Sequence, residues 1–119
     1  MSATLYERLG GSEGITRIAS DVVDNHARNP AIATRFAESN IDQLKHAAAT
    51  FFIQATGGPE VYEGKDMLNT HRGMNISPGE FMAALDDSLG ALQKNGIAQR
   101  EQEEVLYALY SLRSEVVKV

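Results

Sequence analysis

Apolar residues recur along the chain at the spacing of amphipathic helices rather than with the alternation of strands. In the first long stripe they stand at i, i+3, i+4 and i+7, at Ile15, Ile18, Ala19 and Val22. This spacing lines one face of a helix, and the hydroxyl of Ser12 suits the N-cap position in front of it. The helix is expected to end near Asn29, because a residue that precedes proline avoids the α region.

Similar stripes, separated by Gly and Pro, predict the remaining elements. We expect a short opening segment and a helical turn before the second long stripe, and a loop after it. The expected helical segments are 5–9, 32–36, 42–56, 66–72, 78–95 and 99–117. Ser77 and Glu80, with Pro at the first helical position, have the spacing of a capping box and mark the clearest helix start. The pattern predicts an all-α fold with loose connections around residues 57–76.

Composition narrows the class of protein. A length of 119 residues predicts one domain over 1–119, and 43% hydrophobic with 23% charged residues is an ordinary globular balance. The absence of Cys excludes disulfides, thiolate zinc sites and Cys nucleophiles. A net charge of −5 argues against nucleic acid as a partner, because binding phosphates requires a basic surface.

The length of the chain and the distribution of its apolar residues also predict the location of the protein and the size of its core. Without a membrane-length apolar run or a signal-peptide pattern, we expect a cytoplasmic protein with no membrane span. A chain this short buries a modest apolar area, so a large apolar ligand could complete the core.

Candidate chemistry centres on His71, one of three histidines, none of which pairs with another at metal-binding helical spacing. His71 lies in the last turn of a short predicted helix, just before Gly73. One interpretation is a solvent-facing side chain that favours the negative helix C-terminus. The other is a neutral imidazole that serves as an axial ligand of iron.

Apolar residues from four segments favour the second interpretation, because their helical faces could converge around a flat aromatic ligand. The residues are Phe36, Leu44, Ala48, Phe51, Phe52, Met67, Ile76 and Phe81, with the Tyr62 hydroxyl at the rim. Taken alone, each of these residues is better interpreted as plain core. Together they predict a site to which His71 brings the only nitrogen ligand.

Four motifs in register resemble those of group I truncated hemoglobins. They are Leu5-Tyr6-Glu7-Arg8-Leu9-Gly10-Gly11, Arg35-Phe36 followed by Phe51-Phe52, Gly57-Gly58-Pro59-Glu60-Val61-Tyr62-Glu63-Gly64, and Met67-Leu68-Asn69-Thr70-His71-Arg72-Gly73. The resemblance extends from Leu5 to about Val117.

The resemblance implies a two-over-two globin with non-covalent haem b between the helix at 42–56 and the segment that ends at His71. In that family His71 would be the proximal iron ligand and Phe36 would stack on the porphyrin. The remaining matching positions would be Leu44 and Ala48 on the distal side, Phe52 at a gas tunnel and Tyr62 at a propionate.

The chain departs from the family at the residues that usually stabilise bound oxygen. The family's tyrosine position is Val23 here, and the polar distal positions are Leu44 and Ala48. A missing hydrogen-bond donor, worth about 1–3 kcal/mol, should speed oxygen release roughly ten- to a hundredfold.

The other two histidines are expected at the surface. His46 lies roughly 200° around its helix from Leu44 and should point away from the haem, although a rotated helix would make it a sixth iron ligand. His26, close to Arg28, is interpreted as a surface residue.

The leading hypothesis is therefore a haem protein that binds O₂, CO and NO reversibly at iron held by His71, with diatomic gases as its partners. One alternative is a haem enzyme for NO dioxygenation or peroxidase-like chemistry, which would need a reductase. The others are a six-coordinate haem protein for electron transfer or redox sensing, and a small helical interaction module whose aromatic stripes are core.

Overall fold

A computed structural model describes residues 3–119, and regular structure in that range is helical. In chain order the elements are α1 (Leu5–Arg8), α2 (Gly11–Arg28), the 3-10 helix η1 (Ala33–Phe36), α3 (Ile41–Ala55), α4 (Met67–His71), α5 (Pro78–Lys94), α6 (Gln99–Tyr110) and α7 (Arg113–Val116). The prediction of an all-α fold is confirmed.

Side-chain caps fix the starts of several helices. Asn40 caps α3 and Asp66 caps α4, each accepting a hydrogen bond from a backbone amide of the first turn. The capping box expected at α5 is present: the Ser77 hydroxyl accepts from the Glu80 amide at 3.1 Å, and Glu80 Oε1 accepts from the Ser77 amide at 3.0 Å. These caps satisfy amides that have no partner inside the helix.

The start of α2 differs from the prediction. Its N-cap is Gly10, in the left-handed region at φ 98°, and the helix begins at Gly11. Ser12 is therefore inside the helix, and its hydroxyl is hydrogen-bonded to the Tyr6 hydroxyl at 2.7 Å. A glycine can adopt this conformation at no steric cost, which lets the chain turn directly from α1 into α2.

The last predicted helix, 99–117, is also interrupted, since α6 ends at Tyr110 and α7 covers only Arg113–Val116. The chain then pairs with the segment after α4 through an isolated bridge between Ile76 and Val117. The Lys118 amide donates to the Ile76 carbonyl at 2.9 Å, and the Gly73 amide donates to the Val119 carbonyl at 3.0 Å. These hydrogen bonds use backbone groups of Lys118 and Val119, which follow α7, and they tie the C-terminal segment to the chain that follows α4.

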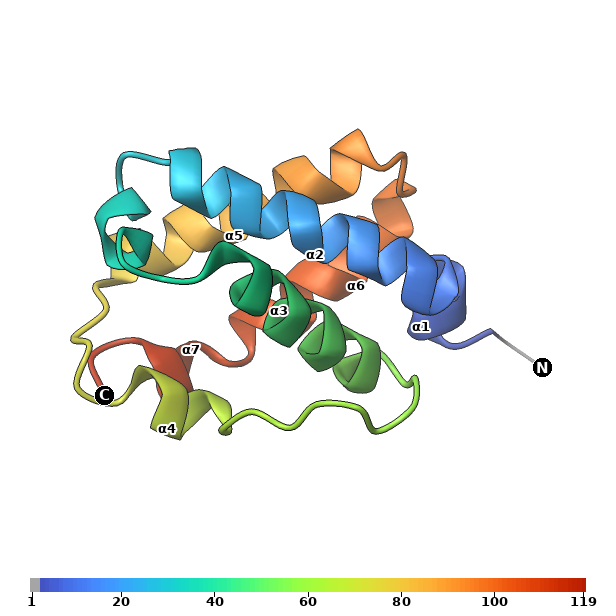
Figure 1. Cartoon of the computed structure of the whole chain (residues 1–119). Helices are drawn as coiled ribbons and strands as arrows, with labels where there is room; N and C mark the ends of the chain where they lie inside the picture. Colours follow the sequence, from blue (N-terminus) through green and yellow to red (C-terminus); the bar gives the residue numbers. More distant parts are fainter. Residues whose placement is uncertain (1–2) are drawn as a thin grey trace.

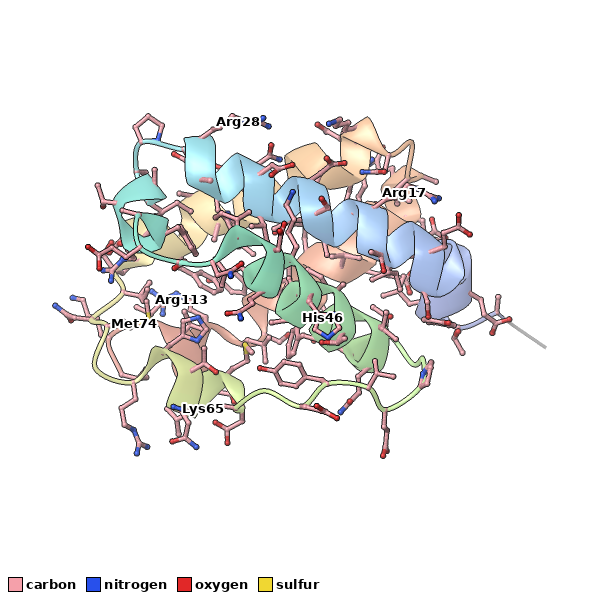
Figure 2. All side chains as sticks on the ribbon, in the orientation of Figure 1. Arg17, Arg28, His46, Lys65, Met74 and Arg113 are labelled. Carbon is pink, nitrogen blue, oxygen red and sulfur yellow. The ribbon has the colours of Figure 1, made fainter. Side chains whose placement is uncertain are left out.

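The long helices form two layers (Figure 1). Helices α2 and α3 cross on the near side of the view, and α5 and α6 lie behind them. The short helices α4 and α7 lie together at the lower left, on the opposite side of α3 from α2. Charged side chains such as Arg17, Arg28 and Lys65 are exposed at the periphery (Figure 2).

The buried apolar residues form two clusters. The larger joins α2, α3, α5 and α6 and includes Ile15, Ile18, Val22, Ile53 and Leu92, while the smaller contains Ile76, Phe81, Leu85 and Val116. Of the helices within residues 3–119, none is both long and apolar enough to cross a membrane.

Candidate functional site

A cavity of about 310 Å³ lies where the two core clusters meet, since residues of both line its wall. All the predicted site residues except Ile76 and His46 line it, together with Phe51. These are Phe36, Leu44, Ala48, Phe52, Tyr62, Met67, His71 and Phe81. The fold thus brings side chains from η1, α3, α4, α5 and the loop at 62 to one apolar chamber.

Ile76 lies behind this wall rather than on it. Its side chain is buried against Phe81, Leu85 and Val116 in the smaller core cluster. Its backbone carbonyl accepts the amide of Lys118. The pairing of the C-terminal segment with residues 73–76 therefore draws Ile76 into the core, and it supports the cavity through Phe81.

His71, at the end of α4, has the chemistry of a metal ligand. Its Nδ1 lies 2.8 Å from the Met67 carbonyl oxygen, and because a carbonyl only accepts, Nδ1 carries the proton and donates. This tautomer leaves the lone pair of Nε2 free, which is the form in which imidazole binds iron. The half-buried side chain lines the cavity rather than facing only solvent.

The hydroxyls around the cavity are already engaged with carbonyl oxygens. The Tyr62 hydroxyl donates to the Lys65 carbonyl at 2.6 Å, Thr70 donates to the Asp66 carbonyl at 2.7 Å, and Ser88 donates to the Ala84 carbonyl at 3.0 Å. Donation from Tyr62 to a propionate, which the resemblance implies, would therefore require its hydroxyl to leave Lys65.

His26 is not the surface residue that the sequence suggested. Its side chain is only 16% exposed, lines the cavity, and is stacked on Phe36 with ring centroids 5.6 Å apart. Its Nδ1 lies 2.8 Å from Asp87 Oδ2 on α5. The missed signal was its spacing, since His26 stands three residues after Val23 and four after Val22, on the same helical face.

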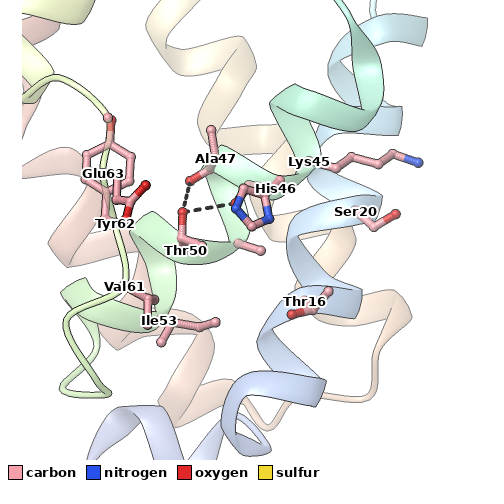
Figure 3. Close-up of a pocket in the computed structure, with 12 residues that line it drawn as sticks. Thr16, Ser20, Lys45, His46, Ala47, Thr50, Ile53, Val61, Tyr62 and Glu63 are labelled. Atoms are coloured by element: carbon pink, nitrogen blue, oxygen red, sulfur yellow. Dashed lines mark hydrogen bonds between the residues drawn. The ribbon is translucent and has the colours of Figure 1, made fainter.

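His46 lies in a different hollow, as its helical phase predicts (Figure 3). This open groove, of about 730 Å³, runs between α2, α3 and the loop at 61–64. His46 is exposed there, and Thr50 donates to the His46 carbonyl at 3.0 Å from the next turn of α3. The structure thus does not bring His46 to the cavity of His71.

An ion pair holds two walls of the cavity together. Both carboxylate oxygens of Glu80 accept from Arg35, whose Nη1 also donates to the Met74 carbonyl at 3.0 Å. Arg35 precedes Phe36 on η1, and Met74 follows His71 by three residues. The Arg35 guanidinium, with a smaller contribution from the Ser77 amide, lowers the pKa of Glu80 to about 2.

Within residues 3–119 no cluster of three or more His, Asp or Glu side chains could hold a metal ion by itself. Among residues 3–119, the nitrogen donors at the cavity are the Nε2 atoms of two imidazoles, His71 and His26, which lie among largely apolar walls. That set suits an apolar cofactor that brings most of its own metal ligands, as haem does.

Comparison with known proteins identifies the class. A family model described as bacterial-like globin matches residues 4–118, so the chain belongs to the bacterial-like globin family. Haem binding and gas binding are properties of globins.

The expected resemblance to group I truncated hemoglobins is confirmed by individual relatives. The chain is 27% identical over 114 residues to the Group 1 truncated hemoglobin GlbN of Mycolicibacterium paratuberculosis, covering 96% of this chain and 84% of that protein. The truncated hemoglobin of Tetrahymena pyriformis in its Fe(III) form superposes with a TM-score of 0.94 at 22% identity, covering 98% and 100% of the two chains. The 2/2 hemoglobin of Synechococcus sp. PCC 7002, solved with covalently attached heme, gives 0.90 at 21% identity and covers 97% and 98%. The truncated globin fold is thereby confirmed.

Proposed function

We propose that the chain holds haem b non-covalently in the cavity beside His71 and binds diatomic gases at its iron. The observation that carries this proposal is the His71 imidazole, whose Nδ1 is fixed by the Met67 carbonyl while Nε2 is left free. When bound, the haem supplies the iron that takes up the gas. The protein would supply the nitrogen ligand, from His71, and a chamber with largely apolar walls.

The apolar walls support this assignment. Phe36, Met67 and Phe81 offer flat or flexible apolar surface for a porphyrin, and Phe52 closes the cavity toward the larger core. The chain contains no Cys, so thioether attachment of the haem vinyl groups is impossible. Non-covalent retention through His71 and apolar burial is the mode that we expect.

Weak retention of oxygen is part of the proposal. Val23, Leu44 and Ala48 line the cavity and have no hydrogen-bond donor in their side chains. Bound O₂ carries partial negative charge and gains from a donor by about 1–3 kcal/mol, whereas CO gains much less. We expect oxygen to leave roughly ten- to a hundredfold faster than from a pocket that supplies such a donor.

The alternative functions have less support. The six-coordinate haem protein depended on His46, which lies in the separate groove. A plain interaction module would have the aromatic stripes as filled core, but here they surround a cavity. NO dioxygenation, and the reductase that it would need, remain predictions. No specific contact among the described residues supports them.

The deciding experiment compares His71→Ala with His46→Ala after haem is added. We expect the wild type and His46→Ala to show the same Soret band and the same ferrous CO spectrum. His71→Ala should lose haem on a desalting column, because it lacks the axial nitrogen. A normal haem content and an unchanged spectrum in His71→Ala would contradict the assignment, and so would a wild type that takes up no haem.

A further inference from the structure

Two imidazoles on the wall of the cavity each keep one unpaired ring nitrogen. The other polar side chains of the wall, Tyr62, Thr70 and Ser88, direct their hydroxyl protons at carbonyl oxygens. His71 and His26 use Nδ1 for a hydrogen bond, and within residues 3–119 no group is hydrogen-bonded to Nε2 of either ring. The axial role proposed for His71 leaves His26 without an assigned function.

Asp87 fixes the proton of His26. Both carboxylate oxygens of Asp87 accept from the side-chain amide nitrogen Nδ2 of Asn29, at 3.1 and 3.2 Å, and Oδ2 also accepts from His26 Nδ1. Asn25 donates to the Asp87 backbone carbonyl at 3.0 Å, which ties α2 to this point of α5. A carboxylate accepts and does not donate, so the neutral ring has its hydrogen on Nδ1 and its lone pair on Nε2.

The two rings belong to opposite walls. His26 is on α2 and His71 on α4, and these helices lie on either side of α3 in Figure 1. A ligand bound opposite His71 would lie on the side of the cavity away from α4, toward side chains such as Val23 and Leu44. His26 is the polar side chain that α2 contributes to this part of the wall.

We propose that Nε2 of His26 accepts a hydrogen bond from a small protic ligand in the cavity, with water as the simplest member of the class. The inference rests on the proposed haem site and specifies its ligand side. The lone pair of Nε2 can accept a hydrogen bond from a ligand that carries an O–H group, such as water or a hydroperoxide. It gives no hydrogen bond to O₂, CO or azide ion, which carry none.

The first test uses the ferric, haem-loaded protein and the variant His26→Phe, which keeps an aromatic ring against Phe36 but removes the acceptor. Resonance Raman and absorption spectra should show a bound water in the wild type and a shift toward five-coordinate, high-spin iron in His26→Phe. His46→Phe serves as the matched control and should resemble the wild type. Equal water occupancy in the wild type and His26→Phe, or five-coordinate iron in the wild type, would overturn the inference.

Ligand affinities provide a second readout. A water held by one net hydrogen bond competes with an incoming anion, so azide affinity should rise by up to about tenfold in His26→Phe. His26→Gln restores an acceptor oxygen and should return part of the water signal. A fall of azide affinity in His26→Phe would show that His26 acts as a donor and would contradict the proposal.

A third measurement needs no haem. Nitrogen-15 NMR of the haem-free protein should find the His26 proton on Nδ1 in the wild type, and Asp87→Asn should move it toward Nε2. A wild-type proton on Nε2 would overturn the inference whatever the haem does. Failure of the wild type to form a ferrous CO complex would instead refute the proposed function, so the two failures are distinguishable.

Discussion

At the scale of single residues, the tightest backbone approach is at Gly14 in the first turn of α2. A Cβ built on Gly14 would lie 2.4 Å from the Leu9 carbonyl oxygen, which is backbone and cannot rotate away. Gly79 in the first turn of α5 has no such neighbour, since its nearest atom would be the Ser77 hydroxyl at 3.9 Å. The same chemical change should therefore have opposite effects at the two helix starts.

We expect Gly14→Ala to lower the free energy of unfolding by about 1–3 kcal/mol, the usual cost of forcing atoms into a filled space. Gly79→Ala should raise it by up to about 1 kcal/mol, because alanine has the higher helix propensity. Urea unfolding followed by circular dichroism measures both. Equal stability of the two variants would show that the junction between α1 and α2 can relax.

At the scale of elements, ion pairs attach the short helices to the long ones. Arg8 on α1 pairs with Glu101 and Glu104 on α6, and its guanidinium lowers the pKa of Glu104. Arg35 on η1 pairs with Glu80 on α5. Short helices have little stability of their own, so they depend on tertiary contacts, and these ion pairs add to the apolar packing that holds α1 in place.

The pair of Arg35 and Glu80 predicts a specific pH dependence. The folded state holds the pKa of Glu80 at about 2, below its ordinary value of 4.5. A lowered folded-state pKa means that the contribution to stability is complete above about pH 4.5 and is lost as the pH falls toward 2. Glu80→Gln should thus be less stable than the wild type at neutral pH, and the difference should shrink over this window.

Denaturant unfolding of both proteins between pH 7 and pH 2.5 measures the effect. Glu103→Gln, which changes an exposed carboxylate on α6, is the control and should differ little from the wild type at any pH. A difference between the wild type and Glu80→Gln that stays constant with pH would exclude the contribution of this ion pair.

At the scale of the whole molecule, the cavity separates the two clusters of the core. Val22 belongs to the larger cluster and Phe81, Leu85 and Val116 to the smaller, and all of them line the cavity. An apolar cofactor between them would bury surface on both sides. The protein that lacks it should consequently be less stable, because a ligand that binds only the folded state adds to its stability.

A ligand at a free concentration of 100 times its Kd adds about 2.7 kcal/mol to the free energy of unfolding. We therefore expect haem loading to raise the Tm of the wild type by at least about 5 °C. Thermal unfolding monitored by circular dichroism, with and without one equivalent of haem, measures the shift. His71→Ala should gain much less, and His46→Ala should gain as much as the wild type. An identical Tm with and without haem in the wild type would contradict a cofactor-completed core.

Much of the fold followed from local signals, and the failures occurred where distant segments meet. The stripes at 42–56 and 78–95 and the capping box at Ser77 predicted α3 and α5 nearly to the residue. The prediction of one helix over 99–117 was wrong, since α6 ends at Tyr110 and α7 covers only Arg113–Val116. The bridge between Val117 and Ile76 was also missed, because it joins segments far apart in sequence. The same pairing moved Ile76 from the expected cavity wall into the core.

By itself, the sequence determined the helical class, the start of α5 at its capping box and most of the apolar side chains around His71, because periodicity and capping act over a few residues. Only the tertiary structure decided which histidine meets which partner. Asp87 stands 61 residues from His26 in the chain, and their hydrogen bond exists because α2 packs on α5. Tertiary packing thus placed His26 on the cavity wall and His46 in a separate groove. This placement decides which polar side chain faces the cavity from α2.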